Sequence, residues 1–438
     1  MIDRIAPVGI SPSTMAVLML SVFTVSIGYG VILPLLPYLV ERLQGVNGDS
    51  AQVSSATGLL TGLYTLSLFL FAALWGHLSD RFGRRLILLI GLGGFSITML
   101  TFAFIENLPA LYAERFLSGM FAAAVAPVAL AAIGDLATTE VVRARRLTFV
   151  SLAGISGFLL GPMLGVFLAR STPNGLLIAN AGGPLTLPLI GTAILGAMAA
   201  LGVLFTLVGN KPAELTRQQS QPALKPTAWL VPKLLAISFI VSAGIGVFEV
   251  GLALRGKQEL GLSQYQIASM FTLCSLVMFV TQAIVFSPWI NPETTRWFIA
   301  PALAVLAVGL YLVPRASTFT LTLLVIGAVA ASAGILSPII TYWISSKAGH
   351  SQGAELGKQT AAASLGAAIG SAAGGILFNV AGLPGASFLL VTALTMLGVF
   401  LSLSLPKMLV AKKLSSSSNK ADAAVSPPNP VLAREPTL

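Results

Sequence analysis

Long apolar runs dominate this chain and constrain its fold more than any other feature. A helix needs about 20 residues to cross roughly 30 Å of hydrocarbon, and the sequence contains twelve runs near that length. The expected spans are residues 15–36, 56–77, 86–105, 109–135, 147–169, 185–208, 231–254, 263–287, 297–314, 319–345, 360–382 and 385–405. We therefore expect an all-α integral membrane protein with twelve transmembrane helices.

Composition supports this class and excludes others. Hydrophobic residues make up 55% of the 438 positions and charged residues only 9%, which is more apolar surface than a soluble domain can bury. The first run is too long for a signal-peptide core and lacks a small-residue cleavage site, so we expect it to be retained. We attribute the net charge of +10 to cytoplasmic loops rather than to nucleic-acid binding.

The distribution of basic residues predicts the orientation. Most of the 25 Lys and Arg residues fall in the even-numbered turns and at the two ends of the chain. Positive charge marks the cytoplasmic side, so both termini are expected in the cytoplasm. We expect the bilayer to be a bacterial inner (plasma) membrane.

One long polar stretch divides the spans six and six. We predict an N-terminal six-helix bundle over residues 1–208, a cytoplasmic linker over 209–232 and a C-terminal six-helix bundle over 233–410. Residues 411–438 are rich in Ser, Pro and Ala, and this composition predicts a disordered cytoplasmic tail.

An internal repeat supports the same division. The segment around span five aligns with the segment around span eleven, matching Gly157 with Gly370 and Gly161 with Gly374. Spans rich in small residues can also align by chance, which is the alternative explanation. A true repeat implies two pseudo-symmetric bundles with the substrate site at their interface.

A charged, glycine-rich turn interrupts the apolar pattern between spans two and three. It contains Gly76, Asp80, Gly83, Arg84 and Arg85. The turn resembles the G-x-x-x-D-x-x-G-R-R signature of the major facilitator superfamily of transporters. That resemblance implies a charge cluster, completed by Asp135 at the end of span four, which latches the two bundles in the outward-open state. The alternative is a solvated turn that only fixes the topology.

Further motifs narrow the resemblance to the twelve-span drug:proton antiporters. Span one carries a G-x5-P-x-x-P pattern that begins at Gly28. Span four carries Arg115 in a pattern with Ser118 where that family has Gln. Span five resembles the antiporter motif, although Val166 replaces the last glycine of the usual pair. The antiporter-type residues are Gly157, Gly161, Pro162 and Gly165. The resemblance covers roughly residues 16–405.

Two charges lie deep enough in the spans to suggest function. Arg115 in span four costs about 2.5–3.5 kcal/mol unless it faces a cavity or the bundle interior, and the family resemblance implies a role in proton coupling. Glu249 in span seven lies at a similar depth, and we predict that it carries the exchangeable proton while Arg115 sets its affinity. Glu114 adjoins Arg115 but points about 100° away around the helix, so it is the weaker candidate. Snorkelling or structural pairing at the outer interface is the alternative for both charges.

The predicted substrate path runs between the bundles. Polar and aromatic candidates for its lining are Tyr29, Tyr64, Thr272, Gln282, Thr341, Tyr342 and Asn379. Each could instead serve helix packing, because hydroxyl and amide side chains also bond between spans.

The chain shows no sign of enzymatic chemistry. Its single cysteine, Cys274, excludes an intrachain disulfide, and the sequence contains no metal-ligand cluster, catalytic constellation or nucleotide loop. We expect no cofactor and a functional monomer. The leading interpretation is proton-driven export of a small amphipathic molecule, such as a drug, an antibiotic or a secreted metabolite like a siderophore. Metabolite uptake, lipid flipping, and a non-transporting scaffold or receptor are the alternatives.

Overall fold

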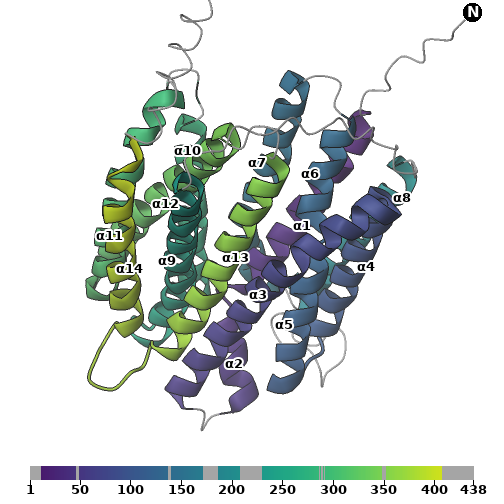
Figure 1. The fold of residues 1–438 in the computed structure, drawn as a ribbon. Helices are drawn as coiled ribbons and strands as arrows, with labels where there is room; N and C mark the ends of the chain where they lie inside the picture. Colours follow the sequence, from purple (N-terminus) through teal and green to yellow (C-terminus); the bar gives the residue numbers. More distant parts are fainter. Residues whose placement is uncertain are drawn as a thin grey trace, which may run out of the picture.

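The computed structural model describes residues 11–45, 49–136, 140–170, 186–207, 229–285, 287, 290, 292–347 and 352–406. These residues form helices joined by short turns (Figure 1). Nine helices in this part of the chain are long and apolar enough to cross a membrane, and α11 and α14 are shorter apolar helices.

The helices follow the predicted spans in order. The first half contains α1 (Pro12–Ile32), α2 (Leu36–Gln44), α3 (Ser50–Phe82), α4 (Arg84–Phe102), α5 (Leu108–Ala122), α6 (Val125–Leu136), α7 (Glu140–Arg170) and α8 (Thr186–Thr206). The second half contains α9 (Leu230–Gln258), α10 (Gln264–Val285), η1 (Pro292–Trp297), α11 (Ile299–Leu312), η2 (Val313–Arg315), α12 (Phe319–Lys347), α13 (Gln352–Ile376) and α14 (Ala386–Ser402).

The helical path breaks at two places. The helix of span one ends with α1 and α2 follows that span as a separate helix, while span four is divided into α5 and α6. Proline explains both breaks, because its ring removes an N–H donor and clashes with the carbonyl four residues earlier. Pro34 lies between α1 and α2, and Pro127 in the first turn of α6 opposes continuation of α5 beyond Ala123.

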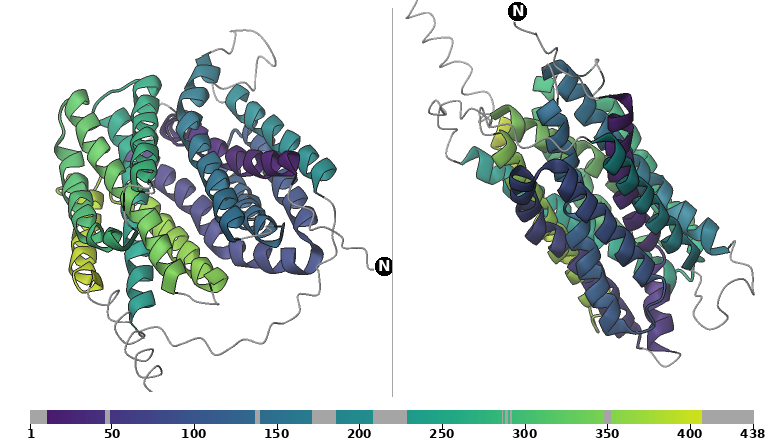
Figure 2. Two further views of the ribbon diagram at one scale, coloured as in Figure 1. Left: turned by 90° about the horizontal axis from the view of Figure 1, so that it is seen from above. Right: turned by 90° about the vertical axis from the view of Figure 1, so that its right-hand side faces the viewer.

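The helices pack into two groups that correspond to the two halves of the chain. In the first, α1 contacts α7 and α8, and α4 contacts α5 and α8; in the second, α9 contacts α13 and α14, and α10 contacts α12. The two groups lie side by side when seen from above (Figure 2).

Glycine contacts repeat between the two groups. Gly157 and Gly161 of α7 face the backbone of α1, and their counterparts Gly370 and Gly374 of α13 face the backbone of α9. The same residue pairs were aligned from the sequence. The close approach of these helices is therefore a feature that the repeat reproduces in both bundles.

The bundles meet mainly along two helix pairs, α3 with α13 and α7 with α10, and α9 makes smaller contacts with α2 and α3. The first pair is especially close, because a Cβ atom on Gly58 would lie 2.6 Å from the Cα atom of Gly375. Helices α3 and α13 run side by side toward the end of the molecule that holds α2 (Figure 1).

The predicted domain boundaries stay predictions. Helix α8 ends at Thr206 and α9 begins at Leu230, and most of the predicted linker lies outside the described residues. The predicted tail over 411–438 lies wholly outside them.

Candidate functional site

The charged turn between α3 and α4 forms a compact network within the first bundle. Arg84 Nη1 lies 2.6 Å from Asp80 Oδ1, and Arg84 Nε donates to Asp135 Oδ2 at 2.9 Å. Gly83, with φ of 94°, makes the turn that separates the two helices. Arg85 donates to the carbonyl of Leu204 on α8 at 2.6 Å. The network therefore ties α3, α4, α6 and α8 together.

The described residues of the expected latch form ion pairs only with one another. Among the described residues, the ion pairs of Asp80, Arg84 and Asp135 stay inside the first bundle. The Asp80 side chain is 64% exposed, and a Cβ atom on Gly76 would meet nothing within 4 Å. The latch itself stays a prediction.

The antiporter-type residues line the contact between α7 and α1. A Cβ atom on Gly157 would lie 2.5 Å from the carbonyl oxygen of Phe23, and one on Gly161 would lie 2.9 Å from Gly30. Gly165 faces Val31 in the same way, and Pro162 approaches Gly30. These residues set the close packing of two helices in the first bundle.

Arg115 and Glu114 form a buried ion pair, contrary to the expectation that Glu114 points away. Arg115 Nε and Nη2 donate to the two oxygens of Glu114 at 2.8 and 3.0 Å, and both side chains are 3% exposed. Both side chains are long enough to turn back around α5 and meet, although their Cα–Cβ bonds diverge. The Arg115 guanidinium also lies 4.4 Å from the Phe102 ring centroid and 5.6 Å from that of Tyr64. Pairing and aromatic contact together offset the cost of burying the charge.

Glu249 is held from the opposite bundle by a tyrosine. The Tyr29 hydroxyl on α1 donates to Glu249 Oε2 on α9 at 2.8 Å, and both residues are half-buried. Within the described residues, no Lys, Arg or His forms an ion pair with Glu249. Glu249 and Arg115 form no ion pair with each other in this conformation, and the predicted coupling between them stays a prediction.

A stack of aromatic rings connects the two charged groups instead. The Tyr29 ring lies between Tyr64, at a centroid distance of 5.2 Å, and Phe158, at 5.9 Å, with interplanar angles of 22° and 24°. The Arg115 guanidinium lies over the Tyr64 ring. A continuous series of contacts therefore joins Glu114 to Glu249 through Arg115, Tyr64 and Tyr29. Sequence reasoning missed Phe158, although its position directly after Gly157 places it on the helix that packs against α1.

The other predicted lining residues have separate surroundings in the second bundle. Thr341 accepts a hydrogen bond from Gln359 at 2.7 Å, and Tyr342 packs edge-on against Trp343. Thr272 and Gln282 on α10 are half-buried. The Thr272 hydroxyl is buried and has no hydrogen-bond partner among the described residues.

Asn379 lies at one end of the interface between the bundles. Helix α13 ends at Ile376, so Asn379 falls in the following turn, where it is exposed. Its Nδ2 donates to Ser54 Oγ on α3 at 2.9 Å and to Gln258 Oε1 on α9 at 3.0 Å. Asn379 therefore joins the two bundles at one end of the molecule.

Further contacts between the bundles gather at this same end. Lys257 pairs with Glu41 at 2.5 Å, donates to the carbonyl of Pro37 at 2.9 Å and lies over the Tyr38 ring. The Tyr38 hydroxyl donates to the carbonyl of Leu262 at 2.7 Å. We call this region the closed end: α2, the start of α3 and the end of α9. Asp80 lies about 45 Å away, near the other end of α3, at a rise of about 1.5 Å per residue from Ser50.

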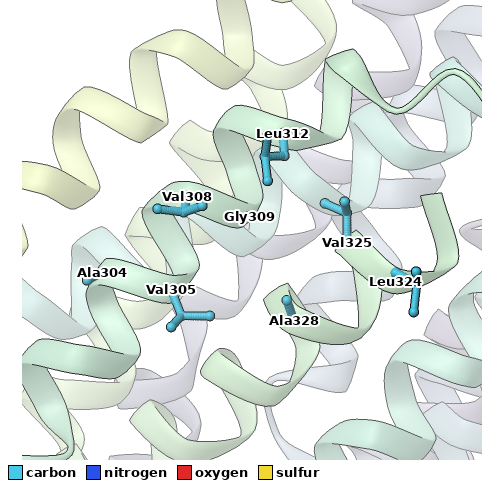
Figure 3. A pocket seen from close by; sticks show the side chains of 8 residues that line it. All are labelled: Ala304, Val305, Val308, Gly309, Leu312, Leu324, Val325 and Ala328. Atoms are coloured by element: carbon cyan, nitrogen blue, oxygen red, sulfur yellow. The ribbon is translucent and has the colours of Figure 1, made fainter. Parts of the chain in front are cut away.

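A hollow on the outside of the second bundle is unsuited to a polar substrate. It lies between α11 and α12 and has a volume of about 370 Å³ (Figure 3). Its lining is entirely apolar: Ala304, Val305, Val308, Gly309, Leu312, Leu324, Val325 and Ala328. Val308 and Leu324 are 56% and 68% exposed, which places the hollow on a surface that faces lipid. Within the described residues, no group of three or more His, Cys, Asp or Glu could hold a metal ion.

Comparisons with known proteins agree with this arrangement. The sequence model of the Major Facilitator Superfamily matches residues 18–357. Multidrug resistance protein 2 of Bacillus subtilis (strain 168) is 26% identical over 376 residues, which cover 83% of this chain and 88% of that protein. Quinolone resistance protein NorA of Staphylococcus aureus (strain COL) is 27% identical over 369 residues, covering 83% and 89%.

Solved structures show the same fold. A D-xylose-proton symporter superposes with a TM-score of 0.73 at 16% identity, over 90% of this chain and 96% of that one. At this identity the likeness establishes the arrangement of twelve helices in two bundles and nothing about the substrate.

Proposed function

Because the chain belongs to the major facilitator superfamily, it is a secondary transporter of a small molecule, and we propose that it exports a small amphipathic compound in exchange for protons. The family consists of transporters rather than enzymes. The names of the bacterial relatives, which refer to multidrug and quinolone resistance, support a drug-like substrate and a plasma-membrane location.

The distribution of basic residues supports the orientation used in this proposal. With both termini in the cytoplasm, the Asp80 turn faces the cytoplasm and the closed end faces the outside. The contacts of Lys257, Gln258 and Asn379 then seal the outer side, and the structure corresponds to an inward-facing conformation. In the outward-facing conformation we expect Asp80 to reach the second bundle and close the latch.

The hydrogen bond between Tyr29 and Glu249 is the observation that carries the proposal. It places an acid at the interface of the two bundles, half-buried and without a basic partner among the described residues. Such a carboxyl group can gain a proton from one side and lose it to the other as the bundles rearrange. The buried Glu114–Arg115 pair, linked to Glu249 through Tyr64 and Tyr29, is the second element of the proposed coupling.

The unit of transport in this proposal is one chain. The two bundles, residues 1–208 and 233–410, enclose the path, and the interface glycines of α3 and α13 belong to the same molecule. Cross-linking in membranes and the mass of the purified particle test this monomeric state.

Transport in reconstituted vesicles tests the proposed function. A thermal-shift screen first identifies compounds that raise the melting temperature of the purified protein. Vesicles that contain the protein should then accumulate the best compound against its gradient when a pH gradient is imposed, and a protonophore should abolish the accumulation. Flux that does not depend on the pH gradient would contradict proton antiport and favour metabolite uptake or lipid flipping.

A further inference from the structure

Tyr29 and Glu249 occupy equivalent positions in the two halves of the molecule. They are 220 residues apart. Gly157 of α7 faces the carbonyl of Phe23 on α1, and the repeat counterpart of Gly157 on α13 faces that of Ala243 on α9, a pair with the same separation. Helices α1 and α9 are therefore repeat equivalents, and the hydrogen bond joins matching positions across the pseudo-twofold relation.

This bond depends on the relative position of the bundles. Its donor belongs to α1 and its acceptor to α9, and the other polar contacts described between the bundles lie at the closed end. Alternating access moves one bundle against the other. A hydrogen bond loses most of its strength once the donor and acceptor separate beyond about 3.5 Å, so it reports which conformation the transporter holds.

The tyrosine is also held in place for this contact. Its ring is stacked between Tyr64 and Phe158, and Tyr64 is only 3% exposed and faces Arg115. These neighbours belong to α3, α7 and α5, all in the first bundle. The hydroxyl therefore moves with the first bundle and not with Glu249.

We propose that Tyr29 is a positioning residue that makes the proton affinity of Glu249 depend on the conformation of the transporter. The inference rests on the proposed function. A donor hydroxyl binds a carboxylate more strongly than it binds the neutral acid, so the bond seen here favours release of the proton from Glu249 to water. Tyr29 keeps its own proton throughout. When the bundles rearrange and the bond breaks, Glu249 holds a proton again.

The other groups around Glu249 are few. Cys274 on α10 and Tyr64 on α3 lie near the site, and the Arg115 guanidinium lies 5.6 Å from the Tyr64 ring centroid. On α13, which packs against α9, Glu355 and Lys358 pair with each other in its first turns. The hydroxyl of Tyr29 is thus the direct polar partner of Glu249 in the described part of the chain.

Infrared titration of the purified protein in lipid nanodiscs tests the proposal without a ligand. The difference between wild type and Glu249→Gln assigns the carboxyl band of Glu249. Tyr29→Phe keeps the ring stack and removes only the hydroxyl, and it should raise the midpoint of this band by about one pH unit, a tenfold change in proton affinity. Tyr311→Phe, which changes an exposed tyrosine on α11 of the second bundle, should leave the midpoint unchanged.

The outcomes distinguish the role of Tyr29 from the role of Glu249. If Tyr29→Phe melts at the wild-type temperature and titrates at the wild-type midpoint, the positioning role is wrong while Glu249 can still carry the proton. If Glu249→Gln removes no titrating band, the proposed proton site itself fails. A raised midpoint in Tyr29→Phe but not in Tyr311→Phe supports the proposal.

Discussion

The crossing of α3 and α13 predicts that one methyl group will shift the transporter between its conformations. In the present structure, a Cβ atom on Gly58 would lie 2.6 Å from both the Cα atom of Gly375 and the carbonyl oxygen of Ser371. Normal contacts with a carbon atom need at least about 3.4 Å, so α13 would have to move by nearly 1 Å. We expect Gly58→Ala to oppose closure of the outer side.

The size of this effect follows from the cost of overpacking. An extra methyl group in a tight contact costs about 1–3 kcal/mol, which corresponds to a shift of about 5- to 150-fold between two states. The cost applies only while α3 and α13 touch. The substitution should therefore favour the other conformation, which is outward-facing in the proposed orientation, over the one described here.

Cysteine labelling from outside measures this shift. Ser371 is fully buried against α3 and α9, so a Ser371→Cys change in a Cys274→Ser background places the single thiol at the crossing. An impermeant maleimide should react with this thiol at least about fivefold faster when Gly58→Ala is added. Gly93→Ala is the matched control, because a Cβ atom there meets nothing within 4 Å. Equal labelling rates in the two backgrounds would refute the reasoning.

Three further predictions concern the other motifs. Asp80→Asn should abolish transport in vesicles and leave the melting temperature nearly unchanged, since this exposed pair contributes at most about 1 kcal/mol; full activity would exclude the latch. Gly161→Leu should lower gradient-driven transport at least about tenfold by forcing α7 from α1, whereas normal flux would make the glycine motif dispensable. Arg115→Ala should lower both transport and the melting temperature, because it leaves the buried Glu114 unpaired at a cost of about 3–5 kcal/mol; an unchanged melting temperature would contradict this.

Much of the fold could be predicted because bilayer thickness fixes the length of apolar runs. The all-α fold of two pseudo-symmetric bundles is confirmed, and the helices fall within a few residues of the expected spans in most cases. The breaks at Pro34 and Pro127 were missed because hydropathy does not register a lost hydrogen bond. Helix ends also differ, since the apolar run marks the hydrocarbon and not the last helical turn.

The candidate site was harder to predict because it depends on side-chain directions. Helix geometry alone separates Glu114 from Arg115, yet rotation about their side-chain bonds brings them together. Depth along the spans placed Glu249 near Arg115. Depth does not reveal that Tyr29 lies between the bundles and donates a hydrogen bond to Glu249. Asn379 was expected inside a helix but lies in a turn, because α13 ends earlier than its apolar run suggested.

Proton movement coupled to substrate movement tests the central claim most directly. Vesicles loaded with a pH-sensitive dye report proton flux when a gradient of the best compound from the thermal-shift screen is imposed. We predict that wild-type protein moves protons opposite to the compound, while Glu249→Gln still exchanges the compound across the membrane but moves no protons. Proton flux of wild-type size in Glu249→Gln would contradict the account.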